Sequence, residues 1–158
     1  MEIDASFSKV WETIGSDRPI SDYSPYVREG LKENWGKVGG QETAHYYNGK
    51  TVNRFIVNWY ENEGYDLNAE MHGQVTRTEL RLKDLGSGRT QLSLVVYPPH
   101  LDKIPFPIDW CLFKIMIQPI TKKYLVGSLE GAKYYFETGE KVQEDQFGGH
   151  PALSAPKE

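Results

Sequence analysis

The pattern of apolar and polar positions divides the chain into two short helices, a run of strands and one long helix. Phe7, Val10 and Ile14 recur at helical spacing before a glycine, which predicts a first short helix capped by a serine. Residues 20–25 indicate one more helical turn, which the closing proline stops. From residue 27 onward the apolar residues recur at every second position, a period typical of half-buried strands.

The register of the central hairpin is predicted from its turn. Asn48-Gly49 is the strongest short-range signal in the chain for a two-residue type I′ turn, which would pair Tyr47 with Lys50. Paired residues of an antiparallel hairpin point to the same side of the sheet. The predicted inward face then consists of Glu42, Ala44, Tyr46, Asn53, Phe55, Val57 and Trp59. The opposite face also contains apolar residues, so the preference is modest.

The predicted order of elements is a short strand at residues 1–5, two short helices, six strands joined by hairpins and one long terminal helix. This order predicts an α+β fold in which the terminal helix covers an antiparallel sheet. One domain is expected at residues 1–139. Residues 140–158 are rich in Glu, Lys, Gly and Pro, and they are predicted to form a flexible C-terminal tail.

The long helix is predicted within residues 106–138. Pro119 has no amide N–H to donate to the carbonyl of Ile115, so it should kink or divide the helix. Upstream of it, residues 108–117 are apolar nearly all round, which suits a pocket lid, a dimer contact or plain burial. Downstream, Gly127, Ser128 and Gly131 fall on the inward side. Such small residues either let the helix approach the sheet closely or leave room for a ligand between them.

Composition and charge narrow the function classes. The 158 residues carry a net charge of −4 with both signs mixed along the chain, which indicates neither a nucleic-acid stripe nor an anionic-membrane patch. Cys111 is the single cysteine, which excludes an internal disulfide and leads us to expect a reducing, cytoplasmic location. No signal-peptide pattern and no spanning apolar run is present, so stable membrane insertion is not expected. The histidines lack metal-ligand spacing, and neither a metal nor another cofactor is expected.

Five short motifs occur in order along residues 3–140, and together they resemble a known superfamily. They are Ala5-Ser6-Phe7-Ser8-Lys9-Val10-Trp11, Ile20-Ser21-Asp22-Tyr23-Ser24-Pro25, Val57-Asn58-Trp59, Gly88-Arg89-Thr90, and Ser128-Leu129-Glu130-Gly131-Ala132-Lys133 with Glu137-Thr138-Gly139. The arrangement resembles the START-like helix-grip superfamily (SRPBCC), in particular its polyketide cyclase/dehydrase-like branch. The first strand is shorter than in that family, and near-family sequences often have a basic residue at the position of Phe55.

The resemblance implies a curved antiparallel sheet that grips the long C-terminal helix around a deep, largely apolar cavity. Members of the superfamily bind lipids, polyketides, isoprenoid quinones or other hydrophobic molecules, and some catalyse cyclisation or dehydration. The resemblance therefore favours the interpretation in which the small helix residues border a cavity. The predicted lining residues are Tyr46, Asn53, Phe55, Val57, Trp59, Leu67, Leu80, Leu94, Trp110, Tyr124, Gly127, Ser128 and Gly131.

Three functions follow as hypotheses. The first is binding of a hydrophobic small molecule or lipid in the cavity. The second is a cyclase- or dehydratase-like enzyme with Glu42 or His45 as its catalytic residue, because a carboxyl group desolvated among aromatic side chains can act as a general acid. An inverted hairpin register would instead turn His45, Arg54 and Asn58 inward. The third is a protein with a filled core that binds a partner or forms a homodimer through residues 108–117.

Overall fold

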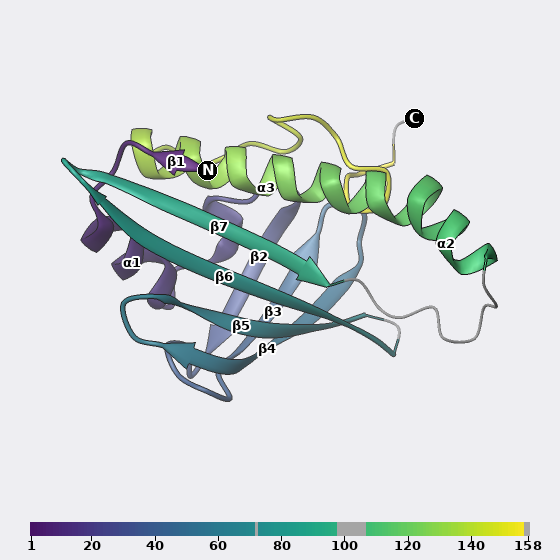
Figure 1. The fold of residues 1–158 in the computed structure, drawn as a ribbon, viewed down its shortest axis with the longest axis horizontal. Helices are drawn as coiled ribbons and strands as arrows, with labels where there is room; N and C mark the ends of the chain where they lie inside the picture. Colours follow the sequence, from purple (N-terminus) through teal and green to yellow (C-terminus); the bar gives the residue numbers. More distant parts are fainter. Residues whose placement is uncertain (72, 98–106, 157–158) are drawn as a thin grey trace.

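A seven-stranded antiparallel sheet curves around one long helix in the computed structural model, which describes residues 1–71, 73–97 and 107–156 (Figure 1). The strand order is β1-β7-β6-β5-β4-β3-β2, so every neighbour except the β1–β7 pair is also next in sequence. The predicted α+β helix-grip architecture is confirmed. The strands are β1 (Glu2–Ile3), β2 (Val27–Glu33), β3 (Gln41–Tyr46), β4 (Thr51–Tyr60), β5 (Gly64–Met71), β6 (Gln74–Gly86) and β7 (Arg89–Tyr97).

Two short helices lie between β1 and β2, and the long helix follows β7. Ser6 caps the first of them by accepting a hydrogen bond from the Lys9 amide at 3.4 Å. The long helix ends at Gly139, whose φ of 78° closes it with a left-handed residue. The helical elements are α1 (Phe7–Gly15), η1 (Ile20–Asp22), α2 (Ile108–Leu112), η2 (Phe113–Ile117) and α3 (Gln118–Thr138).

The break that Pro119 predicts takes the form of a π-helical turn. In η2 the amide of Gln118 donates to the carbonyl of Phe113, five residues back instead of four. This widened turn stands immediately before Pro119, which has no amide N–H to continue the α-helical pattern. The segment therefore remains helical on both sides of the proline.

The β3–β4 hairpin has a register one residue away from the predicted one. Gln41 pairs with Phe55 and Ala44 with Val52. The turn is a three-residue loop, because the Tyr46 amide donates to the Lys50 carbonyl at 2.8 Å and only Gly49 of the loop has a positive φ. A shift by one residue turns every side chain of a strand to the other face.

This register corrects three of the seven residues predicted on the inward face. On β3 the prediction of Glu42, Ala44 and Tyr46 is right, since all three are buried. On β4 the inward residues are instead Val52, Arg54 and Ile56, and the predicted Asn53, Phe55 and Val57 point to the opposite side. An irregularity between Ile56 and Asn58 then brings Trp59 back to the inner side, where its ring stacks on that of Tyr65.

Residues 140–156 pack against the body of the protein, which corrects the prediction of a flexible tail. Val142 and His150 are buried, at 2% and 4% exposure. The amide of Val142 donates to the carbonyl of Asp22 at 3.0 Å, and that of Asp145 donates to the carbonyl of Pro25 at 3.1 Å. The polar composition of this segment concealed the few apolar residues that anchor it.

Candidate functional site

A cavity of about 420 Å³ lies between the inner face of the sheet and α3. Leu67, Leu80 and Leu94 line it from β5, β6 and β7, and Tyr124 and Ser128 line it from α3. Most of its wall is apolar. The lining also includes residues of η2 and of the C-terminal segment, so these two parts of the chain complete the enclosure.

A buried ion pair contributes the charged part of the wall. Arg54 Nη1 lies 3.1 Å from Glu42 Oε2, and Arg54 Nη2 donates to the Tyr46 hydroxyl at 3.3 Å. All three residues are at most 5% exposed. Arg54 and Tyr46 line the cavity, whereas Glu42 stands behind them and is not part of the lining. The other carboxylate oxygen, Glu42 Oε1, has no hydrogen-bond partner among the described residues.

The protonation states of these groups follow from their surroundings. Burial acts to lower the pKa of the Arg54 guanidinium, but the nearby Tyr46 and Glu42 outweigh it and the pKa is raised, so Arg54 stays charged. Burial raises the pKa of the Tyr46 phenol to about 12, against the opposing effect of Arg54. It also raises the pKa of Tyr65, another lining residue. The wall therefore presents a permanent cation and protonated phenols to an otherwise apolar space.

The structure brings six of the predicted lining residues together around this cavity. They are Tyr46, Leu67, Leu80, Leu94, Tyr124 and Ser128. Trp59 packs against the lining residue Tyr65 from outside the cavity. Trp110 lies on α2, away from the wall, and its side chain is 56% exposed. Asn53, Phe55 and Val57 are absent from the wall because of the corrected register.

Gly127 and Gly131 do not border the cavity, so the cavity interpretation is wrong for these two residues. A methyl group on Gly127 would lie 1.9 Å from the hydroxyl oxygen of Tyr26, and one on Gly131 would lie 2.7 Å from the carbonyl oxygen of Tyr23. The two glycines therefore let α3 approach the chain between η1 and β2. Ser128, between them in sequence, is the small residue of this set that faces the cavity.

The two predicted catalytic residues are separated by the sheet. Glu42 is buried on the inner side, but its carboxylate is paired with Arg54 and outside the cavity lining. His45 is on the outer side, where its Nδ1 lies 3.0 Å from the hydroxyl of Thr51. The geometry therefore gives neither residue a position for proton transfer to a molecule in the cavity. The basic residue of the cavity wall is Arg54, one position before Phe55. It was not among the predicted lining residues, because the inward residues of β4 follow only from the observed register.

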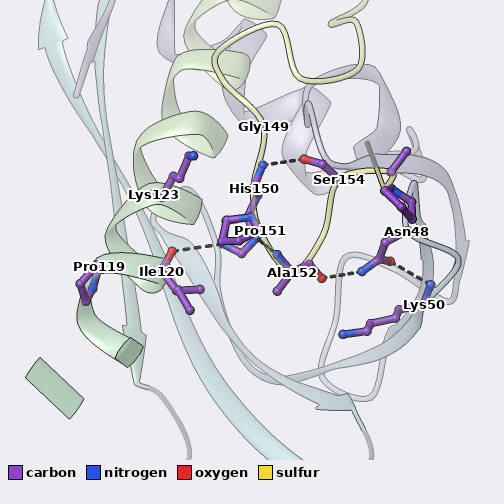
Figure 2. A pocket seen from close by; sticks show the side chains of 12 residues that line it. Asn48, Lys50, Pro119, Ile120, Lys123, Gly149, His150, Pro151, Ala152 and Ser154 are labelled. Carbon is purple, nitrogen blue, oxygen red and sulfur yellow. Dashed lines mark hydrogen bonds between the residues drawn. The ribbon is translucent and has the colours of Figure 1, made fainter. Parts of the chain in front are cut away.

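His150 holds the C-terminal segment against α3 beside the cavity. Its Nε2 lies 3.1 Å from the carbonyl oxygen of Ile120, and its Nδ1 accepts from the amide of Ala152 at 3.2 Å (Figure 2). These two contacts together require a neutral ring, with the proton on Nε2. His150 and Ala152 also line the cavity, and no residue pattern in the sequence had indicated them.

Folding stability is expected to fall on mild acidification because of His150. Burial and the nearby positive charge of Lys123 lower its pKa below the ordinary value, outweighing the hydrogen bond to Ile120, which raises it. The unfolded chain therefore binds a proton first as the pH falls below about 6.5, which favours unfolding. Urea unfolding at pH 7.5 and 5.5 should show this loss in the wild type and in His45→Gln, and a smaller loss in His150→Gln. If His150→Gln lost as much stability between pH 7.5 and 5.5 as the wild type, the effect would come from another titratable group.

A second hollow of about 620 Å³, called the outer hollow, lies between the C-terminal segment, the first turns of α3 and the β3–β4 loop. Figure 2 shows its two lysines, Lys123 from α3 and Lys50 from the β3–β4 loop, on either side of the C-terminal segment. Pro119 and Ile120 form its wall next to η2. Ile120 also lines the inner cavity, so the two spaces are neighbours.

Comparison with known proteins supports the fold. Neither a protein-family model nor a curated protein matches the sequence. Among solved structures, DynU16, a protein of the dynemicin biosynthetic locus, has a TM-score of 0.64 at 15% identity over 89% of this chain. The match covers 46% of DynU16, so this chain spans less than half of that protein's length.

Two further solved structures match over nearly their whole length. Major latex-like protein 151 from Panax ginseng has a TM-score of 0.57 at 13% identity, over 86% of this chain and 93% of its own. Ara h 8.0201 has a TM-score of 0.60 at 14% identity, over 86% and 92%. At such identities these matches establish the helix-grip fold. Within the described ranges, no helix is both long and apolar enough to cross a membrane.

Proposed function

We propose that this protein binds a small hydrophobic molecule that carries an oxygen acceptor, in the cavity between the sheet and α3. The cavity itself supports the proposal. Its volume of about 420 Å³ lies within the range of roughly 300–1,000 Å³ that is usual for small-molecule sites, and its wall combines an apolar majority with a few polar groups. The hypothesis of a partner-binding protein with a filled core does not agree with the presence of this cavity.

The chemistry of the wall narrows the class of ligand. Arg54 offers charged N–H donors and the phenol of Tyr46 offers a hydroxyl, and a carboxylate, phenol or ketone oxygen would accept from both. Leu67, Leu80 and Leu94 would surround the apolar body. We therefore expect fatty acids and aromatic polyphenols or polyketides to bind better than hydrocarbons of the same size.

A fluorescence titration tests the proposal directly. Trp59 stacks on Tyr65 with ring centroids 5.9 Å apart, and Tyr65 lines the cavity, so a bound molecule should change the tryptophan emission. The probes are a long-chain fatty acid and an aromatic polyphenol. A saturable change for at least one of them is expected, and its absence for both would contradict a binding role for these classes.

Replacing Ser128 by leucine should weaken ligand binding by about tenfold or more, equivalent to about 1.4 kcal/mol. The larger side chain would occupy part of the cavity. The Ser128 hydroxyl has no hydrogen-bond partner among the described residues, so its loss should not destabilise the fold. The matched control is Ser128→Ala, which removes the hydroxyl but keeps the space and should bind normally. Unchanged affinity in Ser128→Leu would place the ligand elsewhere.

A further inference from the structure

The segment formed by α2 and η2 exposes an unusual amount of apolar surface. Ile115 is 73% exposed, Ile108 and Met116 are each 55% exposed, and Phe113 is 36% exposed. Because successive residues of a helix are about 100° apart, these side chains point in several directions around the axis. Clustered exposed apolar residues of this kind mark an interaction surface.

This segment stands at the end of the molecule opposite α1, past the end of β7 (Figure 1). The main contacts of α2 and η2 are with one another and with α3. Ile117, the last residue of η2, lines the cavity, as does the partly exposed Ile120 one turn later. The apolar segment therefore adjoins the cavity wall.

The charge around the segment differs in sign from that of the whole chain. Residues 107–126 contain three lysines, at positions 114, 122 and 123, and one aspartate, whereas the chain carries a net charge of −4. Lys123 and Lys50 also flank the outer hollow next to Pro119. Basic side chains beside an apolar helix favour an anionic lipid surface, because the lipid phosphates attract them.

From these observations we infer that residues 108–117 dock on the surface of an anionic membrane, with Lys50 and Lys123 facing the lipid phosphates. A helix that is apolar nearly all round is best covered by an apolar medium on every side, whereas a second copy of the chain would cover one face. At about 1.5 Å per residue the ten residues extend roughly 15 Å, too short to span a bilayer, so the segment enters only the interface.

Docking in this orientation brings the end of the cavity that Ile117 and Ile120 line to the lipid. A hydrophobic molecule could then pass between the bilayer and the cavity without crossing water. This role in ligand exchange rests on the proposed function, whereas the docking itself does not.

Co-sedimentation with lipid vesicles tests the inference. The full chain is expected to bind vesicles of equal phosphatidylcholine and phosphatidylglycerol, and to bind less at high salt or to phosphatidylcholine alone. The double variant Ile115→Glu/Met116→Glu should lose roughly tenfold or more of this binding, because two apolar side chains no longer enter the interface. Lys50→Glu/Lys123→Glu should lose roughly tenfold on the anionic vesicles.

The matched control changes the same residue types at a distant site. Lys37→Glu/Val38→Glu alters an exposed lysine and a valine that is 62% exposed in the β2–β3 loop, and it should bind vesicles as the wild type does. Failure of the wild type to bind the anionic vesicles, or equal binding by Ile115→Glu/Met116→Glu, would overturn the inference. A third result would also overturn it. If the wild type forms a dimer and does not bind vesicles, and Ile115→Glu/Met116→Glu is a monomer, then the segment binds a second copy of the chain.

Ligand titration without vesicles keeps the two proposals apart. Ile115→Glu/Met116→Glu is expected to bind the fatty acid or polyphenol normally, because neither residue lines the cavity. Vesicle binding by a wild type that takes up no ligand would support docking and refute the proposed function. Ligand binding by a wild type that ignores anionic vesicles would overturn docking alone.

Discussion

Replacing Glu42 by glutamine is expected to lower the free energy of unfolding by about 3–5 kcal/mol. The variant keeps the shape of the side chain but leaves the Arg54 guanidinium as a buried charge without its counter-ion. Tyr46 alone cannot compensate, because its hydroxyl is neutral. Urea unfolding at neutral pH, followed by circular dichroism, measures the loss.

The matched control removes both charges together. Glu42→Leu/Arg54→Met replaces the ion pair by apolar side chains of similar volume, which is often neutral or stabilising for buried pairs. This variant should therefore be more stable than Glu42→Gln while it binds a carboxylate ligand poorly, since the anchor is gone. Equal stability of Glu42→Gln and the wild type would show that the pair is not sequestered from water as the structure indicates.

Replacing Gly127 by alanine is expected to cost about 2 kcal/mol of stability, although alanine is the better helix former by roughly 1 kcal/mol. The new methyl group would lie 1.9 Å from the Tyr26 hydroxyl oxygen and 2.7 Å from its ring carbon Cζ. The ring of Tyr26 cannot turn aside, because it is fully buried and contacts Tyr124 and His150. The clash must therefore move the helix or the neighbouring strand.

Thermal unfolding of three variants isolates this clash. Val126→Ala, at the adjacent and exposed position, should change stability by less than about 0.5 kcal/mol. In Tyr26→Phe/Gly127→Ala the closest atom is absent, so part of the loss should be recovered. A Gly127→Ala protein more stable than the wild type would mean that helix propensity outweighs the contact.

The fold could be predicted from the sequence because several local signals agree with it. The alternation of apolar residues fixed the existence of most strands, and Pro119 marked the point at which the long helix changes its geometry. The small residues of α3 were correctly assigned to its inward side. What they contact depends on the distant chain around Tyr26, and nothing in the local pattern specifies that contact.

The cavity wall was harder to predict because the decisive choice was a one-residue register. Asn48-Gly49 fits both a two-residue and a three-residue loop, and both faces of β4 contain large apolar residues. In the observed register Arg54 pairs with Glu42 on the inner face. The alternation of apolar and polar residues gives no indication of an ion pair between two residues on different strands. The net charge of −4 likewise does not reveal the local excess of lysine near η2.

The π-helical turn accommodates one extra residue within the long helix. The turn closes over five residues where an α-helix uses four, so removing one residue would restore a regular α-helical turn and leave the orientation of α2 nearly unchanged. Gly127 and Ser128 lie downstream, and their fit to Tyr26 and to the cavity would be unaffected. The long helix can thus gain or lose one residue at this turn, while both α2 and the part of the helix that shapes the cavity keep their directions.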